Sequence, residues 1–142
     1  IGYCLSGLTS EQCVFFLYGN GRNGKSTFLE IIRAILGEYA TNIQPESIMV
    51  KNSNNSANTD IARLKGARLV TSVEPNEGMR LNEGLIKQLT GDDMVTARKL
   101  YGDEFEYRPE FKLWLATNHK PTIRGTDLGI WRRIHIISFT KS

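Results

Sequence analysis

The sequence has little cysteine and no long hydrophobic run. Its two cysteines, Cys4 and Cys13, are spaced for neither a metal site nor a disulfide framework. We therefore expect both to be small buried thiols of a reducing compartment. No apolar run approaches the ~18 residues that a membrane-spanning helix needs. These shortages argue against a disulfide-rich secreted scaffold and a membrane-spanning protein, so we expect no membrane partner and a cytoplasmic location.

The chain also lacks an initiator methionine and the basic start and long apolar stretch of a signal peptide. Its first four residues are typical of the tail of an upstream helix. The length of 142 residues fits one domain that can bury its own hydrophobic core. We expect residues 1–142 to form a single core domain of a longer protein.

Charge is unevenly distributed along the chain. The net charge is +3, with four basic and five acidic side chains in residues 1–60 but nine basic and five acidic in residues 98–142. A basic C-terminal third suits a polyanionic partner, although such clusters are often only a solvated face.

Apolar runs of strand and helix type alternate along the chain, which predicts an α/β fold with a largely parallel sheet. Residues 38–58 are polar and poorly periodic, and 52–58 read as an exposed loop. A short helix capped by Asn58 or Thr59 follows, and Asn82 is expected to cap a longer one. Gly102 and Asp103 lie between two strand-like segments that predict a β-hairpin insertion near residues 94–108. The expected strands are 13–18, 67–73, 111–117 and 134–139, and the longer helices are 26–36 and 83–89.

The first expected strand runs into a glycine-rich loop that fits the phosphate-binding pattern G-x-x-x-x-G-K-[ST] at every fixed position. The glycines allow a tight turn in which successive N–H groups converge on phosphate oxygens, at the N-terminus of the next helix. Lys25 is expected to reach the β- and γ-phosphates of ATP, and the Ser26 hydroxyl to bind Mg²⁺. The expected nucleotide-binding residues are Gly19, Asn20, Gly21, Arg22, Asn23, Gly24, Lys25, Ser26 and Thr27.

Such a loop needs a second metal anchor, which an acid at the end of a neighbouring strand can supply. Glu74 comes directly after the apolar run 69–73 and is the first candidate. Glu77 lies three residues further along and is the alternative.

Two further positions carry groups suited to phosphoryl chemistry. Asn118 ends a third strand, where its amide could bond both the γ-phosphate and the attacking water without adding negative charge. Arg132 and Arg133 supply cations that could stabilise charge on the transferred phosphoryl group. If either acts on the ATP of a neighbouring copy, the protein must form a ring.

Six segments in order carry a resemblance to superfamily 3 helicases, in the branch fused to primases of phages, plasmids and large DNA viruses. They cover nearly the whole chain, and the first of them, residues 18–27, is specific on its own. The others are residues 67–78, 85–93, 97–101, 114–121 and 130–134.

The resemblance implies an AAA+-like P-loop NTPase core, a homo-hexameric ring, ATP with Mg²⁺, and translocation on single-stranded DNA in phage or plasmid replication in a bacterial host. By match, Glu74 becomes the Walker B acid, Asn118 the sensor, and Arg132 or Arg133 the finger across the subunit interface. The family's DNA-gripping hairpin maps to residues 98–103.

Within that hairpin the expected DNA-binding residues are Arg98, Lys99 and Tyr101. Lys99 is the best phosphate contact, and Tyr101 would offer a stacking surface. Pro75 follows Glu74 where some members carry adjacent acids, so Glu74 and Glu77 remain alternatives for the catalytic base. A second reading of the whole chain, a replication initiator or helicase loader that uses ATP as an assembly switch, shares the same loop.

Overall fold

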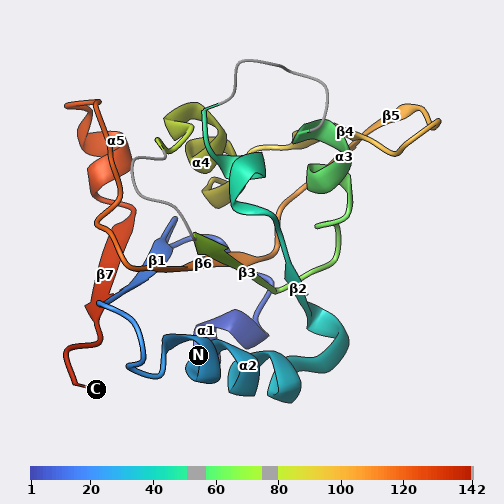
Figure 1. Cartoon of the computed structure of the whole chain (residues 1–142). Helices are drawn as coiled ribbons and strands as arrows, with labels where there is room; N and C mark the ends of the chain where they lie inside the picture. Colours follow the sequence, from blue (N-terminus) through green and yellow to red (C-terminus); the bar gives the residue numbers. More distant parts are fainter. Residues whose placement is uncertain (51–56, 75–79, 142) are drawn as a thin grey trace.

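A five-stranded parallel sheet forms the centre of the molecule (Figure 1). The computed structural model describes residues 1–50, 57–74 and 80–141, and the side chains of residues 57, 58 and 74 lie outside that description. The strand order is β2-β3-β6-β1-β7, and all four pairings are parallel. The strands are β1 (Val14–Tyr18), β2 (Ala40–Asn42), β3 (Leu69–Glu74), β6 (Lys112–Thr117) and β7 (Ile134–Ser138).

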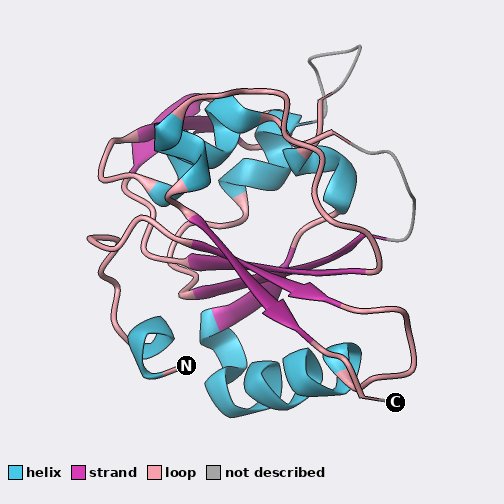
Figure 2. Ribbon diagram, turned by 90° about the vertical axis from the view of Figure 1, so that its left-hand side faces the viewer, coloured by secondary structure: helices cyan, strands magenta, loops and turns pink. Residues whose placement is uncertain are grey.

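Helices cover both faces of this sheet (Figure 2). One face is covered by α1 (Gly2–Leu5) and α2 (Lys25–Leu36), and the other by α3 (Ala57–Ala62), α4 (Glu83–Thr90) and α5 (Leu128–Trp131). Short 3₁₀ turns at Gly37–Tyr39 and Pro45–Ile48 complete the connections. The result is the three-layered α/β arrangement that the alternating pattern predicted.

The central strands are apolar along their whole length because each of their faces meets a different core. In β6, Leu113 and Leu115 join the core under α3, α4 and α5, whereas Trp114 and Ala116 join the core under α2. Side chains in a strand alternate between faces, so a continuous apolar run satisfies both layers.

Two helices have the ends that the sequence predicted. In α2 the buried Leu29, Ile32 and Leu36 form one stripe, and the helix ends at Gly37, whose φ of 55° favours glycine. In α4 the Asn82 side chain accepts a hydrogen bond from Leu85 N at 3.1 Å, which caps the first turn.

The predicted hairpin forms a separate two-stranded antiparallel sheet from β4 (Val95–Arg98) and β5 (Glu104–Tyr107). It extends from the body of the molecule beside α3 (Figure 1). The Tyr107 hydroxyl donates to Ile61 O at 2.7 Å, which fixes the base of the hairpin to α3.

Residues 38–50, for which the sequence predicted no element, contain a strand and part of the core. Residues 40–42 form the edge strand β2, and Ile43, Ile48 and Met49 are buried in the core. A three-residue edge strand is too short to show a period of two, which is why the pattern missed it. The following helix begins at Ala57, so Asn58 and Thr59 lie within it rather than capping it. Residues 51–56 lie outside the described residues.

Both cysteines are buried free thiols, as predicted. Among the described residues, no helix combines the length and apolar character needed to cross a bilayer.

Candidate functional site

The glycine-rich loop lies where two connections of the sheet diverge. After β1 the chain passes through α2 to β2 at one edge, and after β6 it passes through α5 to β7 at the other. The strands β1 and β6 are neighbours, so their carboxyl ends form a topological switch point. Open α/β sheets bind ligands in the crevice outside such a point. Residues 19–24 lie there, between β1 and α2.

The loop backbone follows a path that glycine permits. Gly21 and Gly24 have φ of 84° and 87°, and between them Arg22 has a φ of 48°. Gly19 is required for a different reason: a Cβ there would lie 2.1 Å from Asn23 Nδ2 and 2.4 Å from Phe139 O. The segment is therefore a tight turn held against the end of β7.

The backbone amides at the start of α2 have no hydrogen-bond acceptor within the part of the chain that the structure describes. This applies to the N–H groups of residues 22–27, and the first helical bond runs from Phe28 N to Gly24 O at 2.9 Å. Free amides and the positive end of a helix dipole together favour an anion.

Lys25 brings a buried cation to the same place. Its side chain is only 6% exposed, and Nζ donates to Gly19 O at 2.6 Å and Asn23 Oδ1 at 2.8 Å. Burial lowers the Lys25 pKa below its usual value. Within the described residues the only salt bridge joins Lys87 and Asp127, so Lys25 has no carboxylate partner there. A buried ammonium held by neutral acceptors is suited to an incoming anion.

Asn23 organises this arrangement. Its Oδ1 accepts from Lys25, while its Nδ2 donates to Phe139 O at 2.7 Å, just after β7. One amide side chain thus connects the loop, the lysine and the edge of the sheet. The sequence placed Asn23 among the binding residues without indicating this role.

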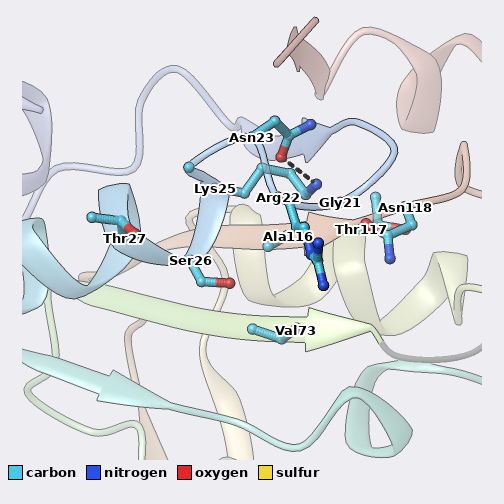
Figure 3. Close-up of a pocket in the computed structure, with 11 residues that line it drawn as sticks. Gly21, Arg22, Asn23, Lys25, Ser26, Thr27, Val73, Ala116, Thr117 and Asn118 are labelled. Atoms are coloured by element: carbon cyan, nitrogen blue, oxygen red, sulfur yellow. Dashed lines mark hydrogen bonds between the residues drawn. The ribbon is translucent and has the colours of Figure 1, made fainter. Parts of the chain in front are cut away.

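A cavity of about 320 Å³ opens in front of the loop (Figure 3). The Ser26 side chain points toward the carboxyl end of β3, where Val73 lies. Asn118, directly after β6, is exposed and lines the opposite side. The structure therefore brings the loop, Ser26 and Asn118 together around one cavity, while the roles given to them stay predictions. The lining residues are Gly21, Arg22, Asn23, Gly24, Lys25, Ser26, Thr27, Val73, Ala116, Thr117 and Asn118.

Glu74 is the last residue of β3 and pairs in register with Thr117 of β6. Thr117 in turn pairs with Tyr18 of β1. The Glu74 backbone therefore lies two strand spacings, roughly 10 Å, from the point where the loop begins. The alternative acid, Glu77, lies outside the described residues. Among the described residues, no group of three or more His, Cys, Asp or Glu side chains could hold a metal ion.

The two arginines lie at the other end of the sheet. They precede Ile134, which is level with Val14 at the start of β1, whereas the loop follows Tyr18 at its end. Four strand residues, about 13 Å, separate these levels. Neither arginine is therefore placed to reach the cavity of its own chain.

The environments of the two arginines differ. Arg133 is 8% exposed, and its guanidinium donates to Gly129 O and Thr90 Oγ1, each at 3.0 Å. Burial lowers the Arg133 pKa. Arg132 is exposed and donates to Gln12 Oε1 at 2.7 Å. Arg133 is thus part of the interior, and Arg132 is presented to the surroundings.

The predicted DNA-contacting residues lie at the far end of the hairpin. Arg98, Lys99 and Tyr101 are all exposed, and Tyr101 completely so. Arg98 lies across from Glu104 in the β4–β5 pairing. Glu104 therefore lies beside Arg98, one of the three residues predicted to contact DNA.

A second cavity, about 350 Å³, lies on the other side of the loop and was not predicted. It is bounded by Tyr18, Gly19, Asn20, Gly21 and Asn23, and by residues 138–141 after β7. Residues 138–141 carry no motif, so only the parallel pairing of β7 with β1 brings them to the loop.

The sequence matches the model of a family described as "Family of unknown function (DUF5906)" over residues 17–133. Among curated relatives, a protein of Acanthamoeba polyphaga mimivirus whose name gives it as a candidate helicase is 38% identical over 137 residues. That match covers 96% of this chain and 14% of the relative. "Primase D5" of Fowlpox virus (strain NVSL) is 28% identical over 141 residues, covering 96% of this chain and 17% of that protein.

Among solved structures, the C-terminal region of NrS-1 in its apo form superposes with a TM-score of 0.69 at 16% identity. The match covers 92% of this chain and 29% of that one, so the two share a fold. The chain spans about one-seventh of the curated relatives' length. The expected bacterial host and the single-domain boundaries remain predictions.

Proposed function

Because this chain belongs to the DUF5906 family, with relatives named as helicase and primase, we propose that it is the ATP-hydrolysing core of a superfamily 3 DNA helicase. In this proposal the protein acts in viral, phage or plasmid DNA replication, with Mg²⁺ as cofactor and single-stranded DNA as partner. One observation carries it. Among the described residues, a row of amides without acceptors and a buried lysine without a carboxylate converge on a cavity at the switch point of a parallel sheet.

The residues present suit a nucleotide polyphosphate. The N–H groups of residues 22–27 would donate hydrogen bonds to phosphate oxygens, and Lys25 would exchange its neutral acceptors for phosphate. Ser26, with Glu74 at the end of β3, would hold Mg²⁺. When bound, the ion would neutralise charge on the β- and γ-phosphates. Asn118, exposed across the cavity, would orient the attacking water.

We further propose that Arg132 is the finger and that it acts on a neighbouring copy. Its distance from its own loop argues against action within one chain. Its guanidinium is exposed and bonded to Gln12, so it could exchange that surface bond for a phosphate of a neighbour. Arg133 is already engaged by Gly129 and Thr90, so it would position α5 and β7 rather than touch phosphate. A finger that acts between copies implies a closed ring, for which we propose the hexamer.

The hairpin favours a motor over an initiator or loader. It carries exposed basic and aromatic side chains on an arm that extends from the body, so it is suited to touch a strand passing through a ring. Contacts with the backbone of the strand would be salt-dependent and independent of sequence.

The decisive experiment measures ATP hydrolysis by the full-length protein with Mg²⁺, with and without single-stranded DNA. We expect DNA-stimulated turnover, its loss in Lys25→Ala, and its retention in Lys87→Ala, which changes a lysine that lines neither cavity at the loop. Hydrolysis at an unchanged rate in Lys25→Ala would refute the site, and no stimulation by any DNA would refute the motor.

The finger is tested by mixing inactive variants. Lys25→Ala and Arg132→Ala should each be inactive alone, and mixed rings should regain part of the activity, because some interfaces then combine an intact loop with an intact arginine. No recovery in confirmed mixed rings would contradict action between copies.

A further inference from the structure

The hairpin has two chemically different faces. Side chains alternate along β4 and β5, so Phe105 and Tyr107 lie on one face and Glu104 and Glu106 on the other. The face with the aromatic residues packs on α3, as the bond from Tyr107 to Ile61 O shows. The acids therefore lie on the face away from α3.

Basic side chains collect on the α3 side. Lys99 Nζ lies 5.9 Å from the centre of the Phe105 ring, and Lys65 Nζ, from the turn that follows α3, lies 5.5 Å from it. Arg63 is exposed beside them. Among the described residues, these three cations share the α3 side with an aromatic ring, while the acids of β5 point elsewhere.

Two of these cations, Arg63 and Lys99, line a cleft. It measures about 210 Å³ and is lined by Thr59, Ala62, Arg63, Lys99 and Leu100. Leu100 is 69% exposed at its edge. The cleft is smaller than a pocket for a drug-sized ligand, which runs to ~300–1,000 Å³. An apolar slot of this size with a cation on each side fits one flat, apolar group attached to an anionic chain.

The hairpin tip beside the cleft is strained. Gly102 N donates to Lys99 O at 2.9 Å and closes a turn in which Tyr101 has a φ of 58°. Glycine is the usual residue where such a turn needs positive φ. A tyrosine there costs of order 1 kcal/mol or more, and strain of this kind is found at functional positions. The turn presents Tyr101 fully exposed next to Leu100.

We propose that the cleft between α3 and the hairpin tip holds one unstacked base of single-stranded DNA, with Arg63 and Lys99 on the flanking phosphates. The inference rests on the DNA partner of the proposed function and adds a base-binding pocket to it. An apolar slot can accept any base face, so the pocket contributes affinity without sequence preference. Arg63 and Lys99 alone could bind the phosphates of a strand with or without bases, whereas only a base could fill the apolar slot.

The test compares binding of the full-length protein to an oligothymidylate and to a matched strand of abasic sites. Three variants are used: Leu100→Ser, Lys99→Gln, and Leu8→Ser. The last removes a leucine of similar exposure, 62%, that is absent from the lining of the cleft.

We expect the abasic strand to bind roughly five- to a hundredfold more weakly, the range for losing one stacked base. Leu100→Ser should weaken the normal strand several-fold and leave the abasic strand unchanged. Lys99→Gln should weaken both strands alike and reduce the salt slope by about one. Leu8→Ser should match wild type. In a strand that carries a single 2-aminopurine, the fluorescence of that base should change when the strand binds the wild-type protein. The change should be smaller when the strand binds Leu100→Ser.

Equal affinity for both strands, or an equal loss for both in Leu100→Ser, would overturn the base pocket and leave a backbone-only contact. Absence of binding to either strand would instead overturn the DNA-binding function itself. The two failures are therefore distinguishable.

Discussion

Replacing Lys25 with methionine separates the role of the charge from that of the fold. Methionine keeps most of the side-chain length but removes the ammonium and its bonds to Gly19 O and Asn23 Oδ1. Hydrogen bonds from a charged donor contribute about 1.5–3 kcal/mol each, but both acceptors belong to residues beside cavities and can bond water once the lysine is gone. Burial already disfavours the ammonium, as its lowered pKa indicates, so the net loss should be about 1–2 kcal/mol.

Wild type and Lys25→Met should differ far more in how much nucleotide stabilises them than in their stability without nucleotide. A ligand present at a hundred times its Kd stabilises the native state by about 2.7 kcal/mol. For a domain of this size 1 kcal/mol corresponds to about 4 °C in Tm. Wild type should therefore gain about 10 °C with ATP and Mg²⁺, whereas Lys25→Met should gain almost nothing.

The assay is thermal unfolding, followed by circular dichroism, at increasing ATP with Mg²⁺. Lys87→Met serves as the matched control, because Lys87 pairs with Asp127 on the surface and should keep the full nucleotide shift. A shift in Lys25→Met equal to that of wild type would refute the assignment of Lys25 to the phosphates.

Three further predictions concern the loop and the hairpin. Gly19→Ala places a Cβ 2.1 Å from Asn23 Nδ2, so we expect a loss of about 1–3 kcal/mol in urea unfolding together with lost ATP binding; unchanged binding would contradict the close approach. Burial raises the Tyr107 pKa to about 12, so the folded state keeps a proton that the unfolded state releases near pH 10, and stability should fall as pH rises from about 10 to about 12. Tyr107→Phe should remove that decline in urea unfolding across the same pH range, and an identical slope would count against it. Tyr101→Gly should relieve the left-handed backbone and raise stability by up to about 1 kcal/mol while weakening single-stranded DNA binding; a marked loss of stability would show that the turn is not strained.

Much of the fold was predictable because each pattern reports a local requirement. The apolar run of β1 reflects burial on both faces, and Asn82 caps α4 through a bond within one turn. The glycine-rich loop was identified because the backbone path itself demands particular residues. The edge strand β2 was missed because three residues on an edge need neither an apolar run nor a period.

The candidate site likewise has a part that the sequence predicted and a part that only the structure decided. The sequence indicated Lys25, Ser26 and Asn118, and the structure places all three on one cavity. It could not choose between Arg132 and Arg133, which are adjacent and chemically alike. Their environments separate them, because one guanidinium is buried against Thr90 and the other is exposed.

The sequence by itself determined the glycine-rich turn, the alternation of strands and helices, and the hairpin, because these depend on backbone conformation and on contacts between near neighbours in the chain. Only the tertiary structure decided that Phe139 closes the loop through Asn23, that both arginines lie at the far end of the sheet, and that Lys99 of the hairpin meets Lys65 at the Phe105 ring. These facts depend on strand order and packing between segments up to 120 residues apart, as in the pairing of Val14 with Ile134, and no local pattern encodes such distances.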